Sequence, residues 1–435
     1  MKRILTILWV IITLGCVFIA INIFKPDVFD LKSKLQKDPS SDQITPTEEE
    51  KPTKTYDKYI LLGDKYSTNK NYALAIKNYK FAATLNSKNI TPYIKLGETY
   101  IKNNEPAKAY ESFLKAIKIN PDSLKSHLGI VQSFINIRQF EKARDYLVTL
   151  DQTQNSVKYY NALMFILFKD FDKAKTVFTE IISAKENADE ITSKYSQKFL
   201  DKYKTFSTFK EGDPLFLQTL LAKAMTEVEQ CEASIPLLYD VINQKPNYGD
   251  PWIILGYAYL KTGKTGDAID AFSNAETKFP DKPETLFFLG LAYFTNNNLD
   301  RAVYYIEAAE KKGYEPKDVV DMKLGDLYTQ QQKYTEAAQK YDEVLAINTS
   351  NIDIFAKAIW LYTEKLNDPA KAIILAQKAV ASFKDNATSY ALLALAYAAS
   401  NDAAKTTDNL QKALDLDPDL DSIYLDLAKT KLQNL

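Results

Sequence analysis

Apolar residues in the stretch 249–282 recur at spacings of three and four in two blocks on either side of a glycine-containing break. The first block holds Trp252, Leu255, Gly256 and Tyr259, and the second holds Ala268, Phe272 and Ala275. Each set falls on one face of a helix. Small residues at Gly256 and Ala268 let two helix backbones approach, and Pro280 ends the second helix. The stretch therefore predicts a pair of packed helices.

The small residue at the centre of the first helix recurs along most of the chain. It stands at Gly63, Gly97, Ala162, Ala222, Gly256, Gly290, Gly325, Ala394 and Ala428, with Val131 and Ile359 in the two remaining slots. The intervals are 34, 34, 31, 60, 34, 34, 35, 34, 35 and 34 residues. A two-helix unit cannot bury its apolar face alone, so the recurrence predicts an array in which neighbouring pairs cover one another.

This pattern resembles the tetratricopeptide repeat, a 34-residue helix-turn-helix unit, in the bacterial form with an N-terminal anchor. The resemblance covers nearly everything after residue 55. It implies an all-α fold, a right-handed α-solenoid of about ten helix pairs with a C-terminal capping helix. The length of 435 residues would otherwise predict about three domains, but an array forms one continuous core instead.

Composition changes and breaks in the repeat spacing predict six segments. These are a membrane anchor at 1–24, a disordered stalk at 25–55, an arm of four repeats at 56–188, an inserted helix or linker at 189–214, an arm of six repeats at 215–420 and a capping helix at 421–435. The insert is expected to be an amphipathic helix because its large apolar residues recur every three to four positions. They are Ile191, Tyr195, Phe199, Tyr203 and Phe206.

The N-terminus contains a candidate membrane span. Residues 4–24 carry no charge and follow Lys2 and Arg3. A helix of this length rises about 1.5 Å per residue and spans a hydrocarbon core of about 30 Å. We therefore predict a single-pass anchor, while cleavage as a signal peptide and lipidation of Cys16 remain open.

The charges that flank this span bear on its orientation. The two basic residues before it favour a cytoplasmic N-terminus, which places the repeats on the extracytoplasmic side of the cell membrane. Four lysines after it favour the opposite orientation, and they are Lys25, Lys32, Lys34 and Lys37. We expect the extracytoplasmic arrangement.

Composition excludes several classes of function. The 55 basic and 56 acidic residues give a net charge of -1, so binding of nucleic acid through its phosphates is not expected. Two cysteines and one histidine do not supply a metal site, and no nucleophile-base pair or phosphate loop is present. His127 occupies the position of Trp252 in the repeat, which indicates a packing role. We predict no enzyme, no cofactor and no metal.

First-helix positions that are not used for packing line the concave side of such arrays. The apolar residues placed there by the repeat register are Ile253, Tyr257, Leu260, Phe287, Leu291, Phe294, Trp360 and Leu395. We predict that they form an exposed groove for a protein or peptide partner. The alternative is that superhelical curvature, the inserted helix or a second copy of the chain covers them.

These observations predict a membrane-anchored scaffold whose concave groove mediates protein-protein interaction, with cell-envelope assembly as the expected process. Two other functions stay open. One is a structural spacer that self-associates into a homo-oligomer, and the other is a regulatory subunit of a separate envelope enzyme.

Overall fold

The computed structural model describes residues 52–184, 189–209, 212–280, 282–418, 420 and 422–434. Over these residues the chain is an all-helical solenoid without a β-strand. The predicted anchor at 4–24 and most of the predicted stalk at 25–55 lie outside them. Among the helices in the described ranges, none combines the length and apolar character needed to cross a bilayer.

The described residues belong to two compact units, which meet at the bond between Lys278 and Phe279. We call residues 52–278 the N-terminal unit and residues 279–434 the C-terminal unit. The boundary falls inside the predicted six-repeat arm at 215–420. The two predicted arms therefore do not coincide with the compact units, and they remain a prediction from repeat spacing.

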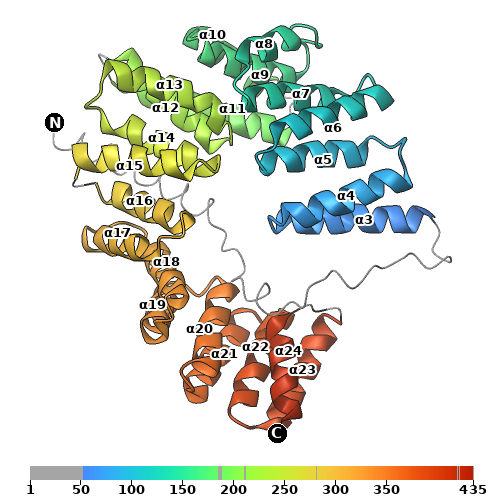
Figure 1. Cartoon of the computed structure of the whole chain (residues 1–435), viewed down its shortest axis with the longest axis vertical. Helices are drawn as coiled ribbons and strands as arrows, with labels where there is room; N and C mark the ends of the chain where they lie inside the picture. The colour runs from blue at the N-terminus through green and yellow to red at the C-terminus, as the bar shows by residue number, and fades with distance from the viewer. Residues whose placement is uncertain are drawn as a thin grey trace. The chain divides into compact units, whose positions relative to one another are not determined.

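The N-terminal unit contains thirteen of the described helices (Figure 1). They are α3 (Pro52–Thr68), α4 (Tyr72–Leu85), α5 (Thr91–Lys102), α6 (Pro106–Ile119), α7 (Leu124–Asn136), α8 (Phe140–Leu147), α9 (Asn155–Leu167), α10 (Phe171–Ser183), α11 (Glu190–Ser207), α12 (Pro214–Glu227), α13 (Cys231–Gln244), α14 (Gly249–Lys261) and α15 (Thr265–Lys278).

The C-terminal unit contains the other nine helices of the described ranges. They are α16 (Pro283–Thr295), α17 (Leu299–Lys311), α18 (Lys317–Gln330), α19 (Tyr334–Ile347), α20 (Ile352–Glu364), α21 (Pro369–Ser382), α22 (Ala387–Ala399), α23 (Ala403–Leu416) and α24 (Ile423–Gln433). Of the 22 helices in the described ranges, all but α11 and α24 form consecutive pairs, which we number repeats 1 to 10.

The two helices of a repeat approach closely where the sequence places its small residue. In repeat 6, a Cβ added to Gly256 would lie 2.7 Å from the ring of Phe272, and in repeat 2 one added to Gly97 would lie 2.5 Å from the ring of Phe113. Contacts this short are not tolerated, so an aromatic ring of the second helix fills the space that the missing side chain leaves. At Gly256 the neighbour is thus the Phe272 ring, whereas at Gly290 an added Cβ would also lie 3.1 Å from the backbone oxygen of Ala302, which is the close backbone approach predicted for the small residues.

The turn between the two helices of each repeat contains one residue with positive φ. These residues are Lys70, Asn104, Arg138, Lys169, Glu229, Gly263, Asn297, Gln332, Asn367 and Asn401. An asparagine or aspartate often follows and caps the second helix, as Asn71 does for the backbone N–H of Leu74 and Asp170 does for that of Lys173. The same turn thus recurs in all ten repeats, which accounts for the regular spacing seen in the sequence.

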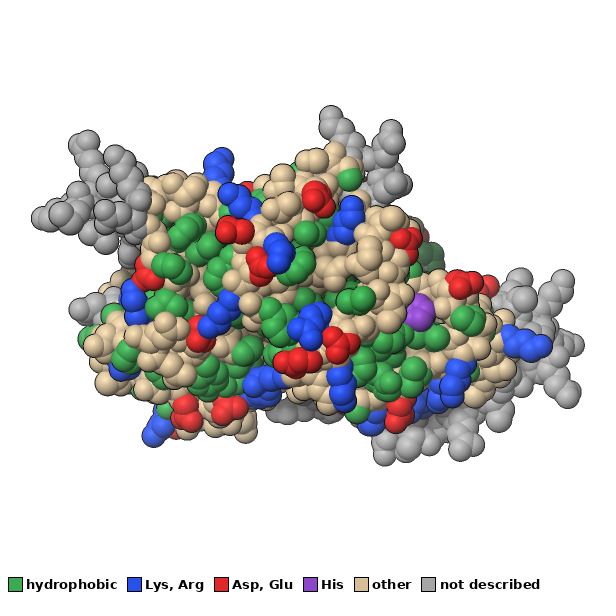
Figure 2. Space-filling view, turned by 90° about the horizontal axis from the view of Figure 1, so that it is seen from above, with side chains coloured by type: hydrophobic (Ala, Val, Ile, Leu, Met, Phe, Trp, Pro, Cys, Tyr) green, Lys and Arg blue, Asp and Glu red, His purple; other side chains and the backbone are tan. Residues whose placement is uncertain are grey.

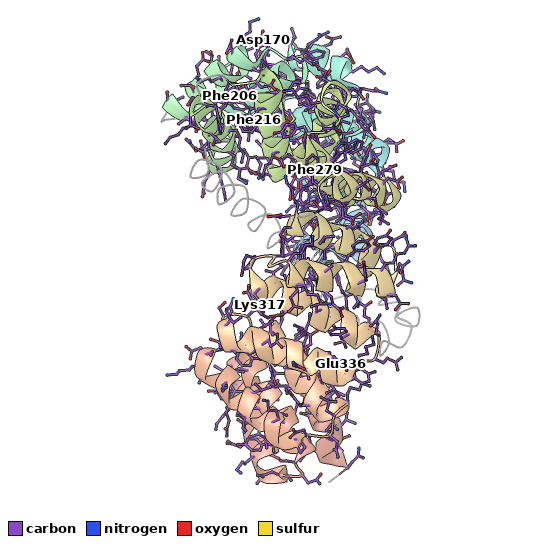
Figure 3. The ribbon with its side chains drawn as sticks, turned by 90° about the vertical axis from the view of Figure 1, so that its left-hand side faces the viewer. Asp170, Phe206, Phe216, Phe279, Lys317 and Glu336 are labelled. Atoms are coloured by element: carbon purple, nitrogen blue, oxygen red, sulfur yellow. The ribbon has the colours of Figure 1, made fainter. Side chains whose placement is uncertain are left out.

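The inserted segment contains one helix, α11, as predicted. The ring of Phe199 stacks on Phe178 of α10 at 4.6 Å, and the Tyr203 hydroxyl donates to the carbonyl of Phe171 at 2.7 Å. At its end, Phe206 lies close to Phe216 of α12, with ring centroids 6.3 Å apart (Figure 3). The prediction that Ile191 belongs to the packed face is wrong, because 63% of this side chain is exposed at the first turn of the helix.

Helix α24 covers the end of the C-terminal unit. Leu425 and Ala428 are buried in a cluster with Leu395 of α22 and Leu410 of α23. The opposite face of the helix is exposed and polar, with Asp426, Lys429, Thr430 and Gln433. An apolar inner face and a polar outer face are what the end of an open array needs.

Candidate functional site

The structure buries most of the predicted groove. In the N-terminal unit, Ile253 and Tyr257 are only 8% and 6% exposed, and Leu260 is partly exposed. In the C-terminal unit, Phe287, Leu291 and Leu395 are fully buried, whereas Phe294 and Trp360 are partly exposed. The expectation that these side chains are exposed is therefore wrong for five of the eight. Their role in partner binding stays a prediction.

Packing within the C-terminal unit explains two of these differences. The ring of Phe287 stacks on Tyr314, with centroids 4.3 Å apart and planes 11° apart. Leu395 lies in the cluster that α24 covers. Periodicity assigns a residue to a face of its helix, but it does not say whether a later loop or helix covers that face. The candidate surface is reduced to Leu260, Phe294 and Trp360.

A polar site lies beside the small residue of repeat 1. The Asp64 carboxylate accepts a hydrogen bond from the Tyr79 hydroxyl at 2.6 Å and pairs with Lys95 of repeat 2 at 2.8 Å. Burial opposes charge on Asp64, but these two partners hold its pKa below the usual range. Burial and the same carboxylate raise the pKa of Tyr79. We call these three residues the Asp64 triad.

The C-terminal unit contains the same arrangement in repeats 8 and 9. Asp326 accepts from the Tyr341 hydroxyl at 2.8 Å and pairs with Lys357 at 2.5 Å, and Lys323 approaches it at 3.6 Å. Burial opposes charge on Asp326, but the ammonium groups of Lys357 and Lys323 hold its pKa below the usual range. We call these four residues the Asp326 cluster. Sequence analysis missed it because charged residues are seldom expected at buried positions.

A second ion-pair network in the C-terminal unit joins three helices. Glu310 of α17, Asp321 of α18 and Glu343 of α19 place carboxylate oxygens within 4.8 Å of one another, a geometry that could hold a metal ion. Lys317, labelled in Figure 3, and Lys340 contact all three carboxylates. The lysines neutralise most of the carboxylate charge, so we interpret the group as an ion-pair network that links α17, α18 and α19.

Polar contacts also join repeats that are distant in the sequence of the N-terminal unit. Gln132 and Gln230 exchange amide hydrogen bonds at 2.8 and 3.1 Å, and Glu232 binds both Arg138 and Lys264 at 2.7 Å. The remaining contacts are Asn104 to the carbonyl of Thr262 at 3.0 Å and Lys169 to Asp240 at 2.7 Å. We call this set the seam. It connects repeats 2, 3 and 4 to repeats 5 and 6.

His127 is satisfied by neighbouring groups. Its Nε2 lies 2.7 Å from the carbonyl oxygen of Pro121 and therefore donates to it, while Nδ1 lies 2.7 Å from the Tyr146 hydroxyl. Trp252 makes the equivalent bond from Nε1 to the carbonyl of Pro246, again six residues earlier. The predicted equivalence of the two positions is thus confirmed, and both side chains fix the loop before their helix.

Charges of both signs are spread over the surface. In the view of Figure 2, basic and acidic side chains lie interspersed among hydrophobic ones. Many form pairs between neighbouring repeats, such as Glu98 with Lys125 at 2.7 Å. Such pairs define which repeat follows which, and they leave a mixed surface that suits a protein partner better than a polyanion.

Comparison with known families identifies the repeats. Sequence profiles of the tetratricopeptide repeat family match residues 90–123, 255–316 and 322–351. These ranges fall on repeat 2, on repeats 6 and 7, and on repeat 8. The chain is therefore a helical solenoid that contains tetratricopeptide repeats, as the sequence predicted, while the bacterial form and the N-terminal anchor stay predictions.

Solved structures similar to the chain include YrrB, described as a TPR protein with an unusual peptide-binding site (16% identity, TM-score 0.39, covering 44% of this chain and 97% of that one). They also include the type IV pilus biogenesis factor PilW (15%, 0.40, 50% and 98%) and yeast Tom70 (17%, 0.34, 88% and 96%). Likenesses of this degree carry no conclusion about function. No protein of curated function shows significant sequence similarity to the chain.

Proposed function

We propose that the protein is a scaffold that binds another protein through the first-helix face of its repeats. We propose further that residues 4–24 anchor it in a membrane, that the repeats lie on the extracytoplasmic side, and that the protein acts in envelope assembly. The observation that carries the scaffold function is the array itself. Tetratricopeptide repeats are typically non-catalytic interaction modules, and this chain consists, over its described residues, of ten helix pairs and two single helices, with pairs 2, 6, 7 and 8 matched to that family.

The proposed contact residues are Leu260 in the N-terminal unit and Phe294 and Trp360 in the C-terminal unit. All three are large, apolar and partly exposed on first helices. Large side chains of this kind contribute most of the binding energy at protein interfaces when a partner removes them from water.

Photo-crosslinking in cells tests this assignment. A photoreactive amino acid is placed at position 260, 294 or 360 of the full-length chain, and captured proteins are identified. Matched controls carry it at Tyr304 and Ile374, which are 66% and 51% exposed on second helices. We expect the same partner from the first-helix positions and not from the controls. Equal capture at both sets would show that the first-helix face is not the binding surface.

The crosslinked product also separates the two alternatives. A product twice the mass of the chain that contains only this sequence would support the self-associating spacer. A product with an enzyme would support the regulatory subunit.

Membrane attachment is tested separately by deleting residues 4–24. The deleted form is expected in the soluble fraction, whereas the full-length chain is expected in the membrane fraction, because burial of about 20 apolar residues anchors a helix stably. Protease added to intact cells then reports the side on which the repeats lie. Recovery of both forms in the same fraction would exclude the anchor without affecting the crosslinking result.

A further inference from the structure

The seam joins structurally equivalent parts of different repeats. Asn104, Arg138 and Lys169 are the positive-φ residues in the helix-helix turns of repeats 2, 3 and 4. Two of their partners lie beside such turns, Thr262 in repeat 6 and Glu232 in repeat 5, whereas Asp240, the partner of Lys169, lies inside α13. The N-terminal unit thus brings turns from both sides of α11 into direct contact.

The inserted helix provides the corner that makes this contact possible. On one side α11 packs against α10 through Phe199 and Phe178, and on the other Lys202 pairs with Glu227 of α12 at 3.0 Å. Both ion-pair partners are largely buried. Because α11 is attached to both neighbours, it links repeat 4 to repeat 5 at this corner.

The seam differs in chemistry from the contacts within each stack of repeats. Within a stack, rings and aliphatic side chains are buried between helices, as Phe178 and Phe199 are. Across the seam the hydrogen bonds and ion pairs join polar groups. The cations Arg138, Lys264 and Lys169 remain 38%, 35% and 50% exposed, whereas Glu232, which binds the first two, is 6% exposed. The exposed pair of Lys169 with Asp240 contributes at most about 1 kcal/mol and is screened by salt, whereas on Glu232 only the cations are open to the solvent.

The seam also occupies a first-helix position. Gln132 of α7 belongs to the row that faces the concave side in the predicted register, and its amide is held by Gln230 and by the Tyr160 hydroxyl. Gln230 itself is 8% exposed, so the amide pair is shielded from water. A partner that used this position would have to separate Gln132 from Gln230 first.

We infer that the seam is a clasp that opens and closes between repeats 2 to 4 on one side and repeats 5 and 6 on the other. When it is closed, it covers Gln132, a first-helix position of repeat 3. Glu232 is its central residue, because one carboxylate holds cations from repeats 3 and 6 together. Opening separates the two sides of the N-terminal unit without unfolding either stack. The idea that a partner binds at Gln132 once the seam is open rests on the proposed function, whereas the opening itself does not.

The clasp is tested by measuring a distance across it in the full-length protein in non-ionic detergent. Spin labels are attached at Lys142→Cys in α8 and Asp267→Cys in α15, both exposed positions outside the seam. Cys16 is changed to serine. Cys231 stays, because burial raises the pKa of its thiol to about 12 and leaves it unreactive.

We expect a short, narrow distance distribution at about 0.01 M salt and a longer, broader one at about 1 M salt, where the Debye length has fallen to about 3 Å. Glu232→Lys, which places three cations together, should give the longer distribution already at low salt. The matched control Asp145→Asn removes an exposed ion pair within α8 and should behave like the wild type.

An unchanged distribution in the wild type across the salt series would overturn the clasp, even if Glu232→Lys did not fold. Circular dichroism distinguishes opening from unfolding, since opening leaves helix content unchanged. A loss of helix in parallel with the distance change would also count against it. Positions 294 and 360 lie in the C-terminal unit, whereas the seam lies in the N-terminal unit. Partner capture at these positions therefore tests the proposed function independently of the distance measurement that tests the clasp.

Discussion

The Asp64 triad and the Asp326 cluster place the same residue types at the same spacing in two different repeats. In each, a tyrosine 15 positions later donates to the aspartate, and a lysine 31 positions later pairs with it. Their exposure differs. The side chains of Asp64 and Lys95 are 40% and 32% exposed, whereas those of Asp326 and Lys357 are 12% and 8% exposed.

The place of each repeat in the array explains this difference. Repeat 8 lies between repeats 7 and 9, whereas no repeat precedes repeat 1 among the described residues. The position that Lys323 holds in repeat 8 is held in repeat 1 by Leu61, which is 71% exposed. The repeat register therefore determines which groups meet, and coverage by neighbouring repeats determines how strongly they interact.

The largest effect is expected from Asp326→Ala. Lys357 would lose its carboxylate inside the fold and Lys323 would lose one partner, and breaking a buried ion pair in this way costs about 3–5 kcal/mol. Hydrogen exchange of α18 to α20 in the full-length protein measures the loss locally, which suits a repeat array better than a single global transition.

The control for this variant is Asp326→Asn, which keeps an acceptor for the Tyr341 hydroxyl and removes the charge. It should lose nearly as much protection as Asp326→Ala. If the free energy of opening fell by less than about 1 kcal/mol in both variants, burial would not strengthen this ion pair, and the Asp326 cluster would not differ in stability from the Asp64 triad.

The next largest effect concerns pH. The pKa of Asp326 is lowered in the folded protein, so its charge stabilises the fold above the unfolded value of about 3.9 and this stabilisation is lost as pH falls through the folded pKa. Stability of the C-terminal unit should thus fall more steeply below about pH 4 in the wild type than in Asp326→Asn. Urea midpoints of the C-terminal unit, detected by hydrogen exchange at a series of pH values, measure how stability depends on pH in both proteins. Equal dependence in the wild type and in Asp326→Asn would contradict the role assigned to the Asp326 charge.

A smaller effect is expected from Asp64→Ala. The pair with Lys95 is partly exposed to water, so its loss should cost no more than about 1 kcal/mol, and added salt should reduce the cost further. Exchange of α3 to α5 at low and high salt provides the measurement. A loss as large as that of Asp326→Ala would mean that exposure does not decide the difference.

The smallest effect is expected at the helix-helix turns, because the turns of repeats 1 and 8 have the same backbone conformation. Lys70 and Gln332 adopt φ of 57° and 61°, a conformation that disfavours side chains with a Cβ. Glycine at either position should stabilise its repeat by on the order of 0.5 kcal/mol, because relief of strain exceeds the entropy that glycine adds to the unfolded chain. Thermal unfolding should give equal gains, and unequal gains would show that coverage matters at the turns as well.

The sequence predicted the local features of the fold well. The helix pairs, the register of their turns, the close approach at Gly256 and the equivalence of His127 with Trp252 all follow from spacing within about 34 residues. These features depend on neighbouring residues in one repeat, and neighbours in the chain are neighbours in space along such an array.

Features that join distant residues could not be predicted in this way. The seam links positions up to 158 residues apart, from Asn104 to Thr262. Burial of Phe287 depends on Tyr314, which follows the next helix, and the Asp326 cluster collects charges from α18 and α20 and a hydroxyl from α19. Periodicity gives the face on which a side chain lies, but coverage depends on the curvature of the whole stack.

The seam restricts how the length of this array can change during evolution. An open solenoid tolerates gain or loss of a whole repeat anywhere, because each repeat contacts only the adjacent ones. Here, a repeat added or removed between α8 and α12 would displace Arg138 from Glu232 and Gln132 from Gln230 by the thickness of a helix pair. We therefore expect homologues to keep this interval constant and to vary in repeat number beyond it.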